Sequence, residues 1–204
     1  MLNTAFAAAL AGLVAVAPAR PAPVHAQAAP APITWKVDGA HSDLQFKIRH
    51  LISKVTGTVR DWTGTIVVDP ASLSGGTVEF TANVATIDTR NERRDGHLKS
   101  AEFFEVEKFP TISFKSTKVV AKGNAMKITG DLTIKGVTKS ITLDAEYLGA
   151  TGAPEAGKQK VGFHASATIN RLDFGVSWNR AIEGGGLTLG DEVELDFNIE
   201  AVRT

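Results

Sequence analysis

The strongest constraint on the fold is an alternation of apolar and polar residues that recurs along most of the chain. In DLQFKIRH, residues 43–50, the side chains of Leu44, Phe46 and Ile48 share one face, and polar or charged side chains occupy the other. Successive side chains of a β-strand point to opposite faces, so this spacing predicts a strand with one buried face. Further segments with the same alternation begin near residues 78, 112, 126, 141, 161 and 193. The pattern therefore predicts an all-β domain.

The segments between these strands carry turn-forming residues. TGTVRDWTGTIVVD, residues 56–69, supplies another strand or a bent pair, with Gly57 and Gly64 as expected bulges or tight bends. Turns are expected at Asp69-Pro70, Gly75-Gly76, Gly123-Asn124, Lys135-Gly136 and along residues 149–157.

About eight strands with one apolar face each are compatible with a sandwich or with a closed antiparallel barrel. Mostly short connections favour a barrel of sequential strands, which also leaves no exposed strand edge. We therefore expect an eight-stranded antiparallel barrel.

The alternation breaks in RRDGHLKSAEFFEVEKF, residues 93–109. Leu98, Ala101 and Phe104 follow one another at a spacing of three, which predicts one or two short helical turns near residues 93–108. The segment should end at Phe109-Pro110, because proline restricts the residue before it. Its aromatic side chains need a surface against which to be buried, and we expect the mouth of the barrel to provide it.

Composition excludes several classes of function. The chain has 22 basic and 22 acidic side chains, without the basic excess expected of a protein that binds nucleic acid or an anionic membrane surface. It has no cysteine, which excludes disulfides, thiol redox chemistry, cysteine nucleophiles and cysteine metal ligands.

The N-terminal residues predict export. An apolar run from Ala5 to Ala17 is too short to span a bilayer, and Val24-His25-Ala26 resembles a signal-peptidase site. We expect residues 1–26 to be a signal peptide, residues 27–32 a flexible tether, and residues 33–204 one domain. The mature chain should contain no transmembrane segment.

A few polar residues raise the question of catalysis or metal binding. Asp95 and His97 could form an acid–base pair, but we favour Asp95 as a helix cap with His97 facing solvent or a backbone carbonyl. A third alternative is that His97 contacts a ligand head group together with Arg94 or Asn91. His41 and His50 are too far apart along the chain to chelate a metal as a local pair, and no metal site is expected.

Five motifs in order along the chain resemble the YceI-like family. They are WKVDGAHSDLQFKIRHL, RRDGHLKSAEFFEVEKFPTISFKS, GDLTIKGVTKSITL, INRLDFGV and GDEVELDFNIEA, between Trp35 and Ala201. The resemblance implies a lipocalin-like antiparallel barrel in a bacterial, frequently periplasmic protein. It also implies binding of polyisoprenoids and related long-chain amphiphiles.

An eight-stranded barrel can be filled by its own side chains or can hold one ligand. Small residues on the inward faces, such as Ala82, Ala145 and Ala165, are compatible with both alternatives. The family resemblance favours an elongated cavity. Candidate lining residues are Phe46, Ile48, Phe80, Phe103, Phe104, Ile112, Phe114, Phe163, Phe174 and Trp178, and candidate head-group contacts are Asn91, Arg94, His97 and Arg171.

The sequence and the resemblance together predict a periplasmic, non-catalytic carrier that holds a polyisoprenoid, a quinone-like molecule or another long-chain amphiphile. No cofactor is expected besides this lipid ligand, and no nucleic-acid partner. A second copy of the chain, in a homodimer, is an open alternative partner. Two other functions remain open: an enzyme acting on such amphiphiles, with Asp95 and His97 as its acid–base pair, and a stress-related structural module with a filled barrel. Arg171 and Asp173, two residues apart in an extended run, are expected to form an ion pair at the barrel end.

Overall fold

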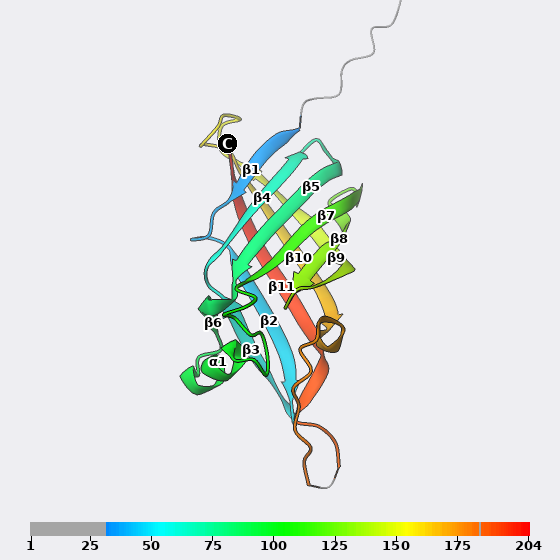
Figure 1. The fold of residues 1–204 in the computed structure, drawn as a ribbon. Helices are drawn as coiled ribbons and strands as arrows, with labels where there is room; N and C mark the ends of the chain where they lie inside the picture. The colour runs from blue at the N-terminus through cyan, green and yellow to red at the C-terminus, as the bar shows by residue number, and fades with distance from the viewer. Residues whose placement is uncertain (1–31, 184) are drawn as a thin grey trace, which may run out of the picture.

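The strands of the protein form one antiparallel sheet that closes on itself (Figure 1). The computed structural model describes residues 32–183 and 185–204, so the expected signal peptide (1–26) and, apart from Pro32, the tether (27–32) lie outside the described residues. The strands are β1 (Ile33–Val37), β2 (Asp43–His50), β3 (Ser53–Val59), β4 (Trp62–Asp69), β5 (Ser72–Asn83), β6 (Ile87–Asp88), β7 (Thr111–Lys122), β8 (Ala125–Ile134), β9 (Val137–Thr151), β10 (Lys160–Asn170) and β11 (Leu189–Arg203).

Two of the barrel strands are bent. β1 pairs with β4 and β2 pairs with β3, so β1–β2 and β3–β4 are the two arms of one long, bent hairpin. Counted in this way, eight long strands surround the interior, and β11 closes the ring by pairing with both β1 and β2. The expected eight-stranded closed barrel is confirmed, and the segment 56–69 contributes to a bent strand.

The hairpin turns follow the glycine signals except at Gly75-Gly76 and at residues 149–151, which still belong to β9. Lys135 and Gly136 both have positive φ, 49° and 74°, as a tight two-residue turn between β8 and β9 requires. Gly75 and Gly76, expected to form a turn, lie inside β5 instead. Gly75 has a φ of 79°, and a Cβ at Gly76 would lie 2.9 Å from the carbonyl oxygen of Val67. The pair therefore allows a local kink in a continuous strand, and the turn prediction is wrong there.

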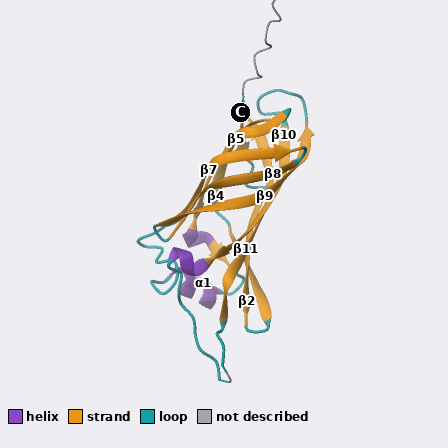
Figure 2. Ribbon diagram, turned by 90° about the vertical axis from the view of Figure 1, so that its right-hand side faces the viewer, coloured by secondary structure: helices purple, strands orange, loops and turns teal. Residues whose placement is uncertain are grey.

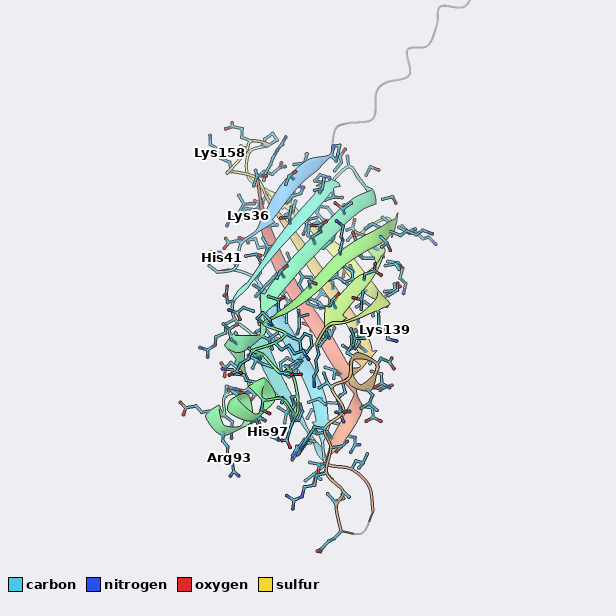
Figure 3. The ribbon with its side chains drawn as sticks, viewed as in Figure 1. Lys36, His41, Arg93, His97, Lys139 and Lys158 are labelled. Carbon is cyan, nitrogen blue, oxygen red and sulfur yellow. The ribbon has the colours of Figure 1, made fainter. Side chains whose placement is uncertain are left out.

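The two ends of the barrel differ. At one end, called here the mouth end, lie the β2–β3 turn, the helix α1 (Glu92–Lys99) and the segment that follows the short 3₁₀ helix η2 (Arg171–Phe174). Figure 2 shows the helical turns below the ring of strands. In Figure 3, Arg93 and His97 mark the mouth end, Lys158 marks the opposite end, and His41 lies between them at the bend between β1 and β2.

The helical segment is shorter than the sequence predicts. α1 ends at Lys99, and residues 101–107 form hydrogen-bonded turns in place of the helix expected near residues 93–108. The side chain of Asn91, rather than Asp95, caps the helix by accepting a hydrogen bond of 3.0 Å from the backbone N–H of Arg94. The helix ends before Ser100, because the backbone of this residue is extended, with ψ at 171°.

The packed core lies toward the opposite end. Trp35 is completely buried, and its indole N–H donates a hydrogen bond of 3.0 Å to the carbonyl oxygen of Val68. Val161 and Ala201 are equally inaccessible beside it in the sheet. This indole bond joins β1 to the end of β4 and satisfies a polar group that would otherwise be buried without a partner.

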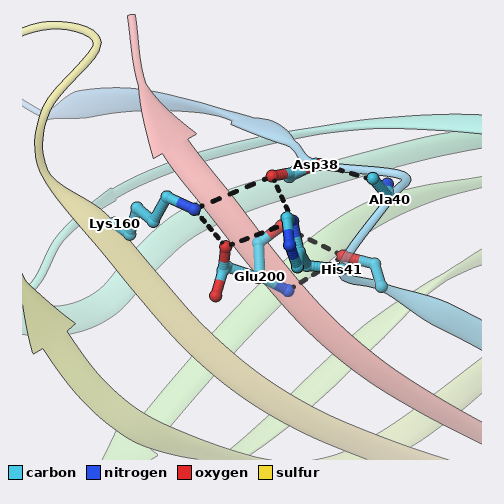
Figure 4. A network of polar contacts seen from close by, with 6 residues as sticks. Asp38, Ala40, His41, Lys160 and Glu200 are labelled. Carbon is cyan, nitrogen blue, oxygen red and sulfur yellow. Dashed lines mark hydrogen bonds and ion pairs between the residues drawn. The ribbon is translucent and has the colours of Figure 1, made fainter.

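An ion network reinforces the corner at which β11 changes its partner from β1 to β2 (Figure 4). The backbone N–H of Asp38 donates to the carbonyl oxygen of Glu200 at 2.8 Å, and Ser42 bonds the backbone of the same residue. Lys160 Nζ lies 2.6 Å from a carboxylate oxygen of Glu200 and 3.8 Å from one of Asp38. His41 lies 2.8 Å from the Asp38 carboxylate. Asp38, His41 and Glu200 are close enough together to hold a cation, but Lys160 already pairs with both carboxylates.

This network predicts a stability difference that depends on pH. The hydrogen bond from His41, followed by that from the backbone N–H of Ala40, lowers the pKa of Asp38 below 3.8. A carboxyl group with a lowered pKa in the folded state stabilises the protein above its unfolded pKa, and this contribution disappears as pH falls through the folded value. We expect Asp38→Asn to be less stable than the unchanged protein at about pH 6 and the difference to shrink at about pH 3. Urea unfolding followed by tryptophan fluorescence measures this, and a pH-independent difference would contradict it.

Candidate functional site

The mouth end of the barrel contains an apolar cavity of about 530 Å³. This volume lies within the range of roughly 300–1,000 Å³ that is typical of small-molecule sites. The inward faces of β2, β5 and β11 form its walls, and residues from the segments 87–104 and 171–189 cover it. Phe46, Ile48 and Leu195 are only half-buried although they lie on inward faces, because they face this space. The protein's own side chains therefore do not fill the barrel.

Most of the aromatic residues singled out from the sequence lie on the cavity wall. They are Phe46, Phe80, Phe103, Phe104, Phe174 and Trp178, with the aliphatic Ile48 and Ile112. Phe114 and Phe163 do not line this cavity. Phe163 instead lines a second, smaller apolar cavity of about 70 Å³ in the opposite half of the barrel. Phe114 lines neither cavity, since it is buried behind Phe80.

Two phenylalanines, Phe80 and Phe197, lie between the two cavities and are called here the aromatic partition. Phe80 stacks on Phe114 with ring centroids 5.7 Å apart, and its centroid lies 5.8 Å from that of Phe197. Phe80 and Phe197 line both cavities. The interior is therefore divided, where the sequence and the resemblance led us to expect one elongated cavity.

Buried Thr89 fixes the segment that covers the mouth. Arg94 donates from Nε to the Thr89 hydroxyl at 2.7 Å and from Nη2 to its carbonyl oxygen at 2.8 Å. The Asp95 carboxylate accepts from the backbone N–H of Thr89 at 2.9 Å and from its hydroxyl. These bonds attach α1 to the end of β6, so Arg94 and Asp95 hold the wall of the cavity in place.

His97 lies on the cavity wall without contacting Asp95. Its ring makes edge contacts with Phe103 and Trp178, at centroid distances of 4.9 and 5.0 Å, and its Nε2 pairs with Glu102. Asp95 is committed to Thr89. The acid–base pair that would support an enzyme is therefore not formed, and the packing of His97 is that of a mouth residue.

Arg171 is the most deeply buried cation among the described residues, with 4% of its surface exposed. It donates from Nε to the carbonyl oxygen of Gly190 at 2.9 Å and from Nη1 to those of Val176 and Trp178 at 2.6 and 2.8 Å. Its Nη2 lies 3.6 Å from a carboxylate oxygen of Asp191. The ion pair therefore forms with Asp191 and not with Asp173, the partner expected from the sequence. Burial lowers the pKa of Arg171, and Asp191 opposes this change.

One atom of this guanidinium makes no hydrogen bond within the protein. Arg171 Nη2 has no hydrogen-bond partner among the described residues, although the side chain lines the cavity. Buried polar atoms are nearly always paired, and the nearest partner of this one is the Asp191 carboxylate at 3.6 Å, too far for a good hydrogen bond. Asn91, Arg94 and His97, the other three head-group candidates, lie on the same cavity wall.

Sequence reasoning missed part of the wall. Leu44, Val193, Leu195 and Phe197 have the same alternation as the residues that were chosen, so this signal could have identified them. Val176 and Leu189, at either end of the segment after η2, follow no periodic pattern that would place them on the wall. Within the described residues, no helix is both long and apolar enough to span a membrane.

Comparisons with known proteins identify related chains over nearly the whole barrel. The profile of the YceI-like domain matches residues 35–201. UPF0312 protein SA2479 of Staphylococcus aureus is 40% identical over 166 residues, which cover 80% of this chain and 94% of the relative.

Solved structures agree with this assignment. The Campylobacter jejuni YCEI protein is 37% identical with a TM-score of 0.66, and the match covers 82% of this chain and 96% of that one. A polyisoprenoid binding domain from Saccharophagus degradans shares the fold at 14% identity, with a TM-score of 0.61 and coverage of 84% and 99%.

The bonds of Arg171 predict a structural role that can be measured. Arg171→Ala leaves three carbonyl oxygens without their donor, and each buried unsatisfied acceptor costs about 1–3 kcal/mol. We expect a loss of about 3 kcal/mol or more in the free energy of unfolding, measured with urea and circular dichroism. Arg180→Ala, at an exposed position of the same segment, is the control and should change stability by less than about 0.5 kcal/mol. Equal effects of the two substitutions would contradict this role.

Proposed function

This chain belongs to the YceI-like family, and on that premise we propose that it is a non-catalytic carrier for an amphiphile with a long hydrocarbon tail. A polyisoprenoid or a quinone-like molecule fits this description. The observation that supports the proposal most strongly is the apolar cavity of about 530 Å³ at the mouth end. The polyisoprenoid binding domain of Saccharophagus degradans, which has the same fold, supports the ligand class.

The cavity wall favours binding by burial of hydrocarbon. Each buried methylene contributes about 0.8 kcal/mol, so a tail of even moderate length offsets the entropy lost on binding. Burial of this kind discriminates weakly between tails of similar shape. Selection should therefore depend on tail length and on the head group.

The head group of the ligand should lie among the polar side chains of the wall. The cation of Arg171, whose Nη2 makes no hydrogen bond among the described residues, and the side chains of His97 and Asn91 lie on the same wall. A phosphate, carbonyl or hydroxyl oxygen would accept from the guanidinium. We place the carrier in the periplasm, in accordance with the signal peptide expected in residues 1–26.

Blocking the cavity tests the proposal directly. Leu195→Trp adds an indole to the cavity wall, whereas Leu148→Trp adds the same group at an exposed position of β9 and serves as the matched control. Excluding two methylenes costs about tenfold in affinity. After expression in a bacterial host, native mass spectrometry should detect bound lipid in the unchanged protein and in Leu148→Trp, and at least about tenfold less in Leu195→Trp. Lipid-free protein that also fails to bind added prenyl alcohols would refute the carrier function.

The aromatic partition predicts a limit on tail length. Phe80→Ala removes the ring that lines both cavities and should connect them. Each further methylene that enters should then raise affinity about fourfold. Titration with a series of prenyl alcohols should show a longer optimum in Phe80→Ala than in the unchanged protein. Tyr147→Phe, which keeps the ring that contacts Phe163 in the opposite half, is the control, and an unchanged optimum in Phe80→Ala would contradict the limit.

A further inference from the structure

Exposed large apolar side chains are concentrated at one end of the barrel. Among the described residues, Val120 and Leu148 lie elsewhere on the strands, and all the others lie at the mouth end. These others are Leu51, Ile52, Val137, Leu172, Ile182 and Leu187. Single exposed apolar residues are normal on a protein surface, but their concentration around the opening of a cavity suggests an interaction site.

Four of these residues form what we call the apolar tip: Leu51, Ile52, Ile182 and Leu187. Leu51 and Ile52 form the β2–β3 turn, and the relative exposure of Ile52 is 104%. Ile182 and Leu187 belong to a loop that is closed by a bridge between Ala181 and Leu187.

Backbone hydrogen bonds hold the two parts of the apolar tip side by side. The N–H of Leu51 donates to the carbonyl oxygen of Thr188 at 2.8 Å, and the N–H of Thr188 donates to that of Arg180 at 2.9 Å. Both parts project from the mouth end in Figure 1. The apolar tip is therefore a defined surface of two joined loops.

The apolar tip is continuous with the cavity. His50 and Thr188 line the cavity, and they are the chain neighbours of Leu51 and Leu187. A hydrocarbon tail that left the cavity at this end would therefore meet apolar side chains before it met water.

We propose that the apolar tip docks on a phospholipid surface, so that the mouth of the cavity faces the lipid from which a ligand is taken or to which it is delivered. The docking step concerns the surface alone, and the transfer step rests on the proposed carrier function. The fully exposed Ile52 and its three partly exposed neighbours in the apolar tip are suited to insertion among acyl chains, as the apolar faces of interfacial segments are.

Charges next to the apolar tip favour anionic head groups. Arg49 and Arg180 are exposed beside it, and Arg49 donates to the carbonyl oxygen of Leu51 at 3.1 Å, which keeps its guanidinium near the turn. Cations near a membrane surface attract anionic lipids. Glu183 and Glu194 are also exposed nearby, so insertion of the apolar side chains should contribute more than charge, and salt should weaken binding only modestly.

Vesicle binding by point variants tests the docking surface. Ile52→Asp and Leu187→Asp place a carboxylate in the apolar tip, and Leu148→Asp, at an exposed apolar position outside the mouth end, is the matched control. Co-sedimentation of lipid-free protein with vesicles of phosphatidylethanolamine and phosphatidylglycerol measures the partition coefficient. We expect a decrease of about tenfold or more for the two apolar-tip variants and none for the control.

Two outcomes would overturn the docking surface. One is vesicle binding that Ile52→Asp and Leu187→Asp leave unchanged or that Leu148→Asp weakens equally. The other is a dimer, detected by light scattering, that Ile52→Asp converts to a monomer, since a second copy of the chain would then cover the apolar tip.

Uptake of farnesol from solution separates this proposal from the carrier function. The apolar-tip variants should take up farnesol as the unchanged protein does, because their substitutions lie outside the cavity wall. If the unchanged protein takes up farnesol but does not bind vesicles, the docking surface alone is overturned. Vesicle binding without farnesol uptake overturns the carrier function alone.

Discussion

The closure of the sheet by β11 is the constraint on which the rest of the structure depends. This strand pairs with β10 along eleven residue pairs, from Lys160–Val202 to Asn170–Glu192, and on its other edge with β1 and then β2. Its alternation places Leu195 and Phe197 on the inward face, where they line the interior. Because the ring is closed, most of its strands are paired along both edges, and the interior is enclosed except at the mouth end.

The same closure explains why the densest aromatic cluster of the chain lies in a polar connection. At the mouth end, β3 has only the two-residue strand β6 on its outer side, so the sheet parts between β3 and β7. The segment between β6 and β7 covers this opening. Its polar residues bond Thr89 or face solvent, and Phe103 turns inward against Trp178, with ring centroids 5.1 Å apart. Charge and aromatic residues thus belong to opposite faces of one cover.

The alternation predicted the strands, but it did not predict the position of each side chain along the barrel axis. It placed Phe80 and Phe114 on inward faces, whereas only the pairing of Phe80 with Phe114 across β5 and β7 shows that the two rings stack, with Phe114 behind the aromatic partition. Pairing register depends on contacts between distant strands, which a period of two does not encode. The segments that cover the cavity had even less sequence signal, because the bonds from Arg171 to carbonyl oxygens and from Thr89 to Asp95 involve loops without periodicity.

The order of features along the barrel also gives a bound amphiphile a direction. The apolar tip lies outside, the polar wall groups His97 and Arg171 lie near the opening, and Phe80 and Phe197 close the inner end. An amphiphile that entered head first would place its polar group against these two rings, and an unpaired polar group in an apolar site costs several kcal/mol. Entry with the tail first leaves the head group beside the polar wall groups Arg171 and His97. A lipid that leaves a membrane can enter the cavity tail first only if the mouth surrounds its tail before its head group. This requires that the rim of the mouth be apolar.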